Sequence, residues 1–174
     1  MLARLQKLFL CGTSALIGNL IKHMIVREYS ENDWSRLCEI HDLARLDELR
    51  GASLEDAFIP LEIAAKNEDL FDYRLLVAED NDQVVGFIAH DDEEIAWLYV
   101  DPTAYRRGVG KALVNAVIGS PARTFSIEVL KGNITALNFY QSVGFIETGI
   151  ASGRMPGNEK FHVTVHTLDN AKST

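Results

Sequence analysis

Cysteine and positive charge are both scarce in this sequence. Two cysteines, Cys11 and Cys38, occur in 174 residues. They are too few for the disulfide framework of a small secreted domain, so we expect a cytoplasmic protein in a reducing compartment. Seventeen lysines and arginines face 25 acidic residues, which gives a formal net charge of -8. So acidic a surface is poorly suited to binding phosphate backbones, and we predict no nucleic-acid partner.

Long apolar runs are also absent. No run approaches the roughly 20 residues that a membrane-spanning helix needs, so we predict no membrane span. Residues 1–23 contain no acidic residue and repeat apolar side chains at helical spacing, with glycines between them. We interpret them as an N-terminal amphipathic extension that contacts the partner subunit of a homodimer. A signal peptide is the alternative, although no convincing small-x-small cleavage site follows.

The overall composition, 47% hydrophobic and 24% charged residues, is typical of one soluble domain with its own core. We place this domain at residues 24–168 and a C-terminal tail at 169–174. Periodicity and turn residues predict strands over 24–29, 73–78, 84–90, 94–100, 125–130, 145–149 and 161–168. They predict helices from 34 to about 41, over 46–57 and 61–70 with a break at Pro60, over 108–118 and over 134–142.

The stretch from Glu94 to Ile118 organises the rest. Its first part is apolar and rich in aromatic and β-branched residues, and Asp101-Pro102 ends it, as expected for a mostly buried strand. Its last part has the apolar spacing of a helix. Two glycines, Gly108 and Gly110, stand where the predicted helix begins.

Glycines at a helix N-terminus bring free N–H groups and the positive end of the helix dipole close to a ligand. Three cations flank them here: Arg106, Arg107 and Lys111. The pattern predicts a phosphate-binding loop built mainly from the main chain. An ordinary tight turn between strand and helix is the alternative. The glycines are too close together for G-x-x-x-x-G-K-[S/T], and Leu113 rules out G-x-G-x-x-G.

Two motifs of the sequence are informative together. The first is V-D-P at 100–102 followed by R-G-V-G-K-A-L at 107–113. The second is N-I-T-A-L-N-F-Y-Q-S-V-G-F at 133–145. They resemble the pyrophosphate loop [R/Q]-x-x-G-x-[G/A] and the downstream segment N-x-x-A-x-x-F-Y-x-x-x-G-F of the GNAT superfamily of acyl-CoA N-acyltransferases, and the resemblance covers roughly residues 24–168. Tyr105 stands where the family has Arg or Gln.

The resemblance implies a fold and an activity. The fold is an α/β sandwich whose mixed, mostly antiparallel central sheet contains a splayed parallel strand pair, with helices on both faces. The activity is transfer of an acetyl group from acetyl-CoA to a primary amine. Direct attack in a ternary complex is favoured, because neither motif contains a cysteine that could carry the acetyl group. The alternatives are acetylation of a protein or peptide, and an acyl-CoA-binding regulatory module without catalysis.

The resemblance also implies which residues bind acetyl-CoA. In the family the pantetheine arm bonds the main chain of the first splayed strand, which corresponds to Leu98 and Val100. Asn133 corresponds to a residue that bonds the CoA arm, and its alternative role is a helix N-cap. The loop residues expected to bind the phosphates are Arg106, Arg107, Gly108, Val109, Gly110, Lys111 and Ala112.

Two residues are expected to be catalytic. Tyr140 corresponds to the tyrosine whose hydroxyl lies near the CoA sulfur in relatives, and it would protonate the leaving thiolate. Its alternative role is a packed helix aromatic. Glu94 aligns with a strand glutamate that acts as base in some members. By strand alternation it shares a face with Leu98 and Val100, but it could equally just end the acidic turn 91–93.

Charge favours a cationic acceptor, because the domain is acidic and the turn before Glu94 is acidic as well. The loop 151–159 offers Arg154, Asn158 and Glu159 as acceptor contacts, or is a solvated hairpin loop. His162 and His166 share one face of a strand, but without a third ligand we predict no metal.

Overall fold

The structure is a computed structural model that describes residues 24–119 and 123–170. The predicted extension at 1–23 and most of the predicted tail lie outside the described residues. The strands are β1 (Met24–Glu28), β2 (Arg74–Asp80), β3 (Gln83–His90), β4 (Ile95–Val100), β5 (Ser126–Leu130), β6 (Phe145–Arg154) and β7 (His162–Asn170). The helices are α1 (Trp34–Ala52), α2 (Leu61–Asn67), α3 (Val109–Ile118) and α4 (Ile134–Ser142).

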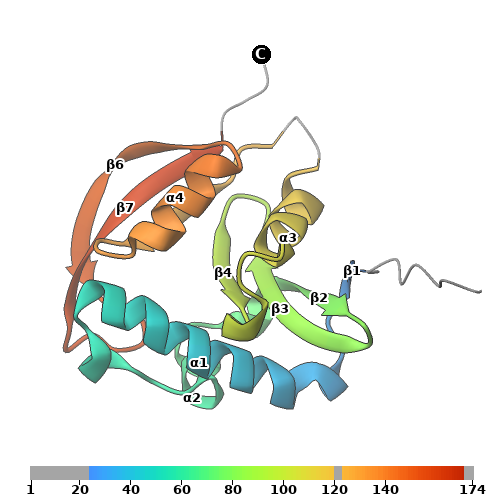
Figure 1. Cartoon of the computed structure of the whole chain (residues 1–174). Coiled ribbons are helices and arrows are strands. Elements are labelled where there is room, and N and C mark those ends of the chain that lie inside the picture. The colour runs from blue at the N-terminus through green and yellow to red at the C-terminus, as the bar shows by residue number, and fades with distance from the viewer. Residues whose placement is uncertain (1–23, 120–122, 171–174) are drawn as a thin grey trace, which may run out of the picture.

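The first four strands form an antiparallel meander in the order β1-β2-β3-β4 (Figure 1). The β2–β3 hairpin turns through Asn81 and Asp82, whose φ angles are 52° and 60°. Two left-handed residues in succession are what a two-residue type I′ turn requires. Asn and Asp suit such a turn, because both tolerate the left-handed backbone conformation.

The last three strands form a second antiparallel sheet in the order β5-β7-β6. The two sheets meet where Glu94 and Ser126 form a parallel bridge, with the Ser126 N–H donating to the Glu93 carbonyl at 2.8 Å. Beyond this bridge β4 and β5 separate. The expected splayed parallel pair within a mostly antiparallel arrangement is therefore confirmed.

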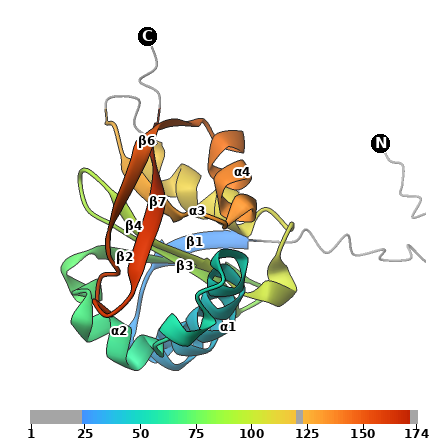
Figure 2. The ribbon, with the colours of Figure 1, turned by 90° about the vertical axis from the view of Figure 1, so that its left-hand side faces the viewer.

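Helices cover both faces of the meander, as expected (Figure 2). On one face α3 and α4 enclose a core cluster that includes Ile88, Leu113 and Phe125, each 1% exposed or less. On the other face α1 and α2 enclose a second cluster that includes Leu37 and Phe87, both fully buried. Strand β4 is therefore held between two hydrophobic clusters, one on each face of the sheet.

Several predicted boundaries are wrong, among them the end of α2, which lies at Asn67 and not at residue 70. Helix α1 is continuous from Trp34 to Ala52, without the predicted interruption between residues 41 and 46, because its buried positions lie along one face of the helix. Ser53, whose backbone is left-handed, caps its end. Strand β6 continues to Arg154 instead of ending at Gly149, because it keeps pairing with β7. Strand β7 extends through Asp169 and Asn170, beyond the predicted end at Leu168.

Candidate active site

Strand β4 presents free main-chain groups toward β5. In the β3–β4 ladder Gly86 lies opposite Val100, and the N–H of Asp101 donates to the Val85 carbonyl at 2.9 Å. Because hydrogen-bonded pairs alternate along an antiparallel ladder, Leu98 and Val100 direct their N–H and C=O groups away from β3. Within the described residues no strand pairs with them there. The structure places both residues where an extended ligand arm could add to the strand.

The loop before α3 has the geometry of an anion site. Gly108 precedes the helix with φ of 87°, and no side chain caps the helix N-terminus. The first intrahelical bond runs from the Ala112 N–H to the Gly108 carbonyl at 3.0 Å, so the N–H groups of Val109, Gly110 and Lys111 precede it and have no intrahelical acceptor. A Cβ on Gly110 would lie 3.1 Å from the Phe139 ring. The two sequence motifs therefore pack directly against each other.

The three cations of this loop have different surroundings. Arg106 has a φ of 63° and is exposed, as is the side chain of Lys111. The Arg107 guanidinium instead forms an ion pair with Asp80, which is buried at the end of β2. The structure therefore brings the side chains of Arg106 and Lys111 to the loop surface, whereas that of Arg107 is engaged in the fold.

This difference gives a paired prediction. Arg107→Ala should lower the free energy of unfolding by about 1–3 kcal/mol, because it leaves a buried acceptor without its donor, and should leave CoA binding nearly unchanged. Arg106→Ala should leave stability unchanged and weaken CoA binding about two- to fivefold, since an exposed ion pair contributes up to about 1 kcal/mol. Chemical denaturation and calorimetric titration with CoA measure the two effects. Weakened CoA binding in Arg107→Ala without lost stability would contradict the assignment.

Tyr140 is buried in the core cluster that α3 and α4 enclose. It is 8% exposed, and its ring packs edge-on against those of Phe139 and Phe145, with centroids 5.1 Å and 5.6 Å away. Burial, and then the negative charge of Glu48, raise the pKa of Tyr140 well above the ordinary tyrosine value. The hydroxyl thus stays protonated at neutral pH and could donate a proton.

Asn133 is the N-cap of α4, because its Oδ1 accepts from the Ala136 N–H at 3.1 Å. The alternative role is therefore present, and bonding to the CoA arm stays a prediction. The preceding Gly132 has φ of 106°, and a Cβ there would lie 2.5 Å from the Gly51 carbonyl oxygen. The end of α1 and the start of α4 are thus in main-chain contact.

Glu94 does not share a face with Leu98, and that expectation is wrong. The β3–β4 register shifts by one residue between Ile95 and Trp97, and such a bulge reverses the side-chain alternation. The Tyr73 hydroxyl donates to Glu94 Oε1 at 2.6 Å. This bond and burial raise the pKa of Tyr73 to about 12. Glu94 as base stays a prediction.

A cavity of about 380 Å³ lies where β4 and β5 separate. Ala96 and Glu128 each lie two residues beyond the Glu94–Ser126 bridge, and both line it. Its walls come from both sheets, from α1 and α2, and from the β6–β7 loop. The separation of the two strands therefore opens the cavity next to the free edge of β4.

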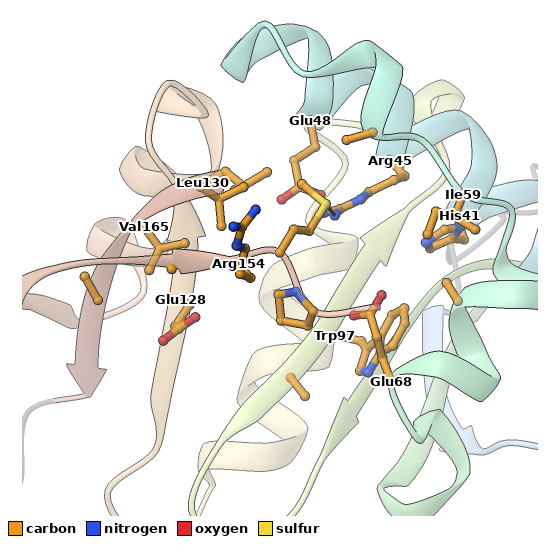
Figure 3. Close-up of a pocket in the computed structure, with 18 of the residues that line it drawn as sticks. His41, Arg45, Glu48, Ile59, Glu68, Trp97, Glu128, Leu130, Arg154 and Val165 are labelled. Atoms are coloured by element: carbon orange, nitrogen blue, oxygen red, sulfur yellow. Dashed lines mark hydrogen bonds and ion pairs between the residues drawn. The ribbon is translucent and has the colours of Figure 1, made fainter. Parts of the chain in front are cut away.

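Charged side chains that the sequence patterns did not single out line this cavity. Figure 3 shows Arg45 and Glu48 pointing into it from α1. Arg45 donates to Glu48 Oε2 at 2.7 Å, and the Tyr99 hydroxyl donates to the same oxygen at 3.2 Å. Glu48 thus holds two cavity side chains together, and its charge also acts on Tyr140. No motif marked these residues, since only the packing of α1 across β4 brings them together.

His41 also lines the cavity. Its ring packs edge-on against Tyr99, with centroids 4.7 Å apart, and its Nδ1 lies 2.9 Å from Asp42 Oδ1. Burial, partly offset by Asp42, lowers the pKa of His41. At neutral pH the imidazole is therefore uncharged.

The β6–β7 loop forms one wall. Met155 is 3% exposed, and Asn158 Nδ2 donates to the Ala57 carbonyl at 3.0 Å, so the loop is fastened to the rest of the domain. Arg154 lines the cavity and donates to the Glu159 carbonyl at 3.1 Å. Of the three predicted acceptor contacts, the structure brings the side chain of Arg154 to the cavity and uses that of Asn158 to hold the loop.

The two histidines of β7 are separate from this site. His166 Nδ1 lies 2.9 Å from Glu147 Oε1. Within residues 24–119 and 123–170, no three His, Cys, Asp or Glu side chains gather as a metal site would require.

Comparison with known proteins agrees with this geometry. The family described as acetyltransferase (GNAT) domain matches residues 71–147. The N-acetyltransferase YafP of Escherichia coli K12, described as uncharacterized, is 30% identical over 123 residues, which cover 69% of this chain and 79% of YafP. The peptidyl-lysine N-acetyltransferase YiaC of the same strain is 37% identical over 70 residues, 40% of this chain and 47% of YiaC.

One solved structure adds a ligand to the comparison. The acetyltransferase YncA of Salmonella typhimurium, solved with its cofactor acetyl-CoA, superposes with a TM-score of 0.61 at 18% identity and covers 86% of this chain and 94% of its own. The chain therefore belongs to the GNAT family, has its fold, and is an N-acetyltransferase. Among the helices that the structure describes, none is both long and apolar enough to cross a membrane.

Proposed function

We propose that the chain moves an acetyl group from acetyl-CoA to a primary amine, bound as a cation in the cavity, by direct attack in a ternary complex. The observation that carries this proposal is the cavity at the separation of β4 and β5. The cavity could hold the acceptor, and it adjoins the edge of β4 where the main-chain groups of Leu98 and Val100 are free. A volume of about 380 Å³ is within the range of small-molecule sites.

The residues present fit acetyl-CoA. The helix N-terminus at Gly108, with Arg106 and Lys111 beside it, suits the phosphates. Gly108 has no side chain and open space around its Cβ position, so the main chain can approach a ligand closely. Leu98 and Val100 would bond the pantetheine arm through their main chain. Acetyl-CoA supplies the acetyl group as a thioester.

Tyr140 supplies the proton that the departing sulfur requires. Burial favours its protonated form, so the proton is available throughout the neutral range. A cysteine carrier is not needed for this scheme. Within the described residues Cys38 is the free cysteine, and burial raises its pKa to about 11, so it is a poor nucleophile at neutral pH.

Similarity to YiaC supports a second acceptor, the lysine side chain of a peptide. A lysine ends in the same primary ammonium group as a small alkylamine, and both could enter the cavity. The net charge of -8 favours a cationic acceptor of either kind.

Acetyl-CoA turnover tests the proposal, read as free thiol release with a panel of small primary amines and lysine-containing peptides. We expect at least one member to stimulate release well above the hydrolysis background. Small amines and peptides compared at equal concentration distinguish the two acceptors. If acetyl-CoA binds but nothing stimulates release, the acyl-CoA-binding regulatory module is favoured instead.

A further inference from the structure

Glu68 is a cavity carboxylate without a partner that would neutralise it. It follows α2 directly, lines the cavity, and makes no side-chain hydrogen bond or ion pair within the described residues. The β6–β7 loop closes over it: a Cβ on Gly157 would lie 2.9 Å from Glu68 Oε1. A partly buried carboxylate of this kind suits a cationic ligand, because burying a charge without a partner is costly.

The charged groups around Glu68 act on that cost in both directions. Burial, together with the charges of Glu48 on α1 and Glu159 on the loop, raises the pKa of Glu68 to about 7, while Arg45 acts in the opposite direction. Arg45 does not neutralise Glu68, because it donates to Glu48 at 2.7 Å. Glu68 therefore exchanges its proton closer to neutral pH than an ordinary glutamate does, as suits a proton acceptor.

We propose that Glu68 binds the ammonium group of the acceptor and removes its proton, an assignment that rests on the proposed function. One N–H bond of the ammonium breaks, the proton joins the carboxylate, and the nitrogen lone pair becomes free. The nitrogen then forms a bond to the thioester carbon, the C–S bond breaks, and the sulfur takes the proton of Tyr140. The nitrogen loses a second proton, which restores Tyr140, and Glu68 releases the first to solvent.

The other carboxylates near the site are less suitable. Glu128 lines the same cavity but is exposed to solvent. Glu94 accepts from Tyr73 and does not line the cavity. Glu48 accepts from Arg45 and from Tyr99. Trp97, which lines the same cavity, offers an aromatic wall for an alkyl chain and its cation. The acceptor class that this arrangement fits is an unbranched primary alkylamine, free or as a lysine side chain.

The test compares three isosteric variants, Glu68→Gln, Glu94→Gln and the control Glu62→Gln, which changes an exposed carboxylate on α2. Acetyl-CoA binding by calorimetry checks the proposed function separately, and all three should bind like wild type. With an amine that stimulates wild type, Glu68→Gln should lower kcat/KM about 100-fold or more, the usual contribution of a positioned base. Glu62→Gln should stay within about twofold.

The pH profile separates a proton acceptor from a residue with a structural role. Wild-type kcat/KM should rise through an apparent pKa near 7 that stays in place for two amines of different basicity, and Glu68→Gln should lack this limb. A full rate and an intact limb in Glu68→Gln, or the same losses in Glu94→Gln instead, would overturn the assignment. If wild type binds acetyl-CoA and no amine stimulates it, the proposed function fails first and this assignment fails with it.

A stability measurement checks the variant without any turnover. Because burial raises the pKa of Glu68 in the folded state, ionisation opposes folding, and stability is lost as pH rises from about 4.5 toward 7. Glu68→Gln removes that loss, so its melting temperature should exceed that of wild type at pH 8 and match it at pH 4. A lower melting temperature at both pH values would show that the carboxylate holds the fold together, and would overturn the assignment.

Discussion

Replacing Tyr140 by phenylalanine is expected to lower kcat at least about 100-fold, roughly the contribution of a positioned acid. The ring stays in its packing against Phe139 and Phe145, and the lost hydroxyl makes no hydrogen bond to a described side chain. Stability and acetyl-CoA binding should therefore change little. Thiol release at saturating acetyl-CoA and amine measures kcat, and calorimetry measures binding.

A matched control and a pH series make this result specific. Tyr29→Phe removes a hydroxyl from a half-buried tyrosine beside Phe71, outside the cavity, and should keep wild-type kcat. Because burial keeps Tyr140 protonated well above pH 9, no fall in the wild-type rate below that pH should come from its ionisation. More than a third of wild-type kcat in Tyr140→Phe would exclude its role as acid.

Local patterns predicted the parts of the fold that local chemistry controls. Helix α4 has the expected bounds, because Asn133 caps its start and Gly144, with φ of 99°, marks its end. The β2–β3 turn follows in the same way from Asn81 and Asp82. The glycine-rich turn before α3 was recognisable because glycine spacing is visible in a sequence, and phosphate binding there stays a prediction.

Partners distant in sequence were not predictable. The sequence predicts Arg107 as a phosphate ligand, yet its guanidinium pairs with Asp80, 27 residues earlier, at the end of β2. The bulge that places Glu94 on the face opposite to Leu98 depends on how β4 pairs with β3, and no residue type in β4 predicts it. Glu68 is an ordinary acid at the end of a helix. Only the β6–β7 loop, nearly 90 residues later, encloses it.

Gly132, just before α4, contacts the end of α1 at Gly51, although the two glycines are distant in sequence. Gly132→Ala is expected to lower the free energy of unfolding by roughly 2–6 kcal/mol. A φ of 106° strains any side chain by about 1–3 kcal/mol. Crowding adds about 1–3 kcal/mol, because the new Cβ would lie 2.5 Å from the Gly51 carbonyl oxygen, a main-chain atom that cannot rotate away. Chemical denaturation measures the sum.

Gly144→Ala separates the two contributions, because Gly144 has a similar φ of 99° and nothing within 4 Å of its Cβ position. It should show the backbone strain alone. Gly132→Ala should in addition push the end of α1 away from α4, and so move Glu48 from the surroundings of Tyr140. Its kcat, measured at a temperature where it is still folded, should fall further than that of Gly144→Ala. Equal stability and equal kcat in the two variants would mean that α1 and α4 are held together elsewhere.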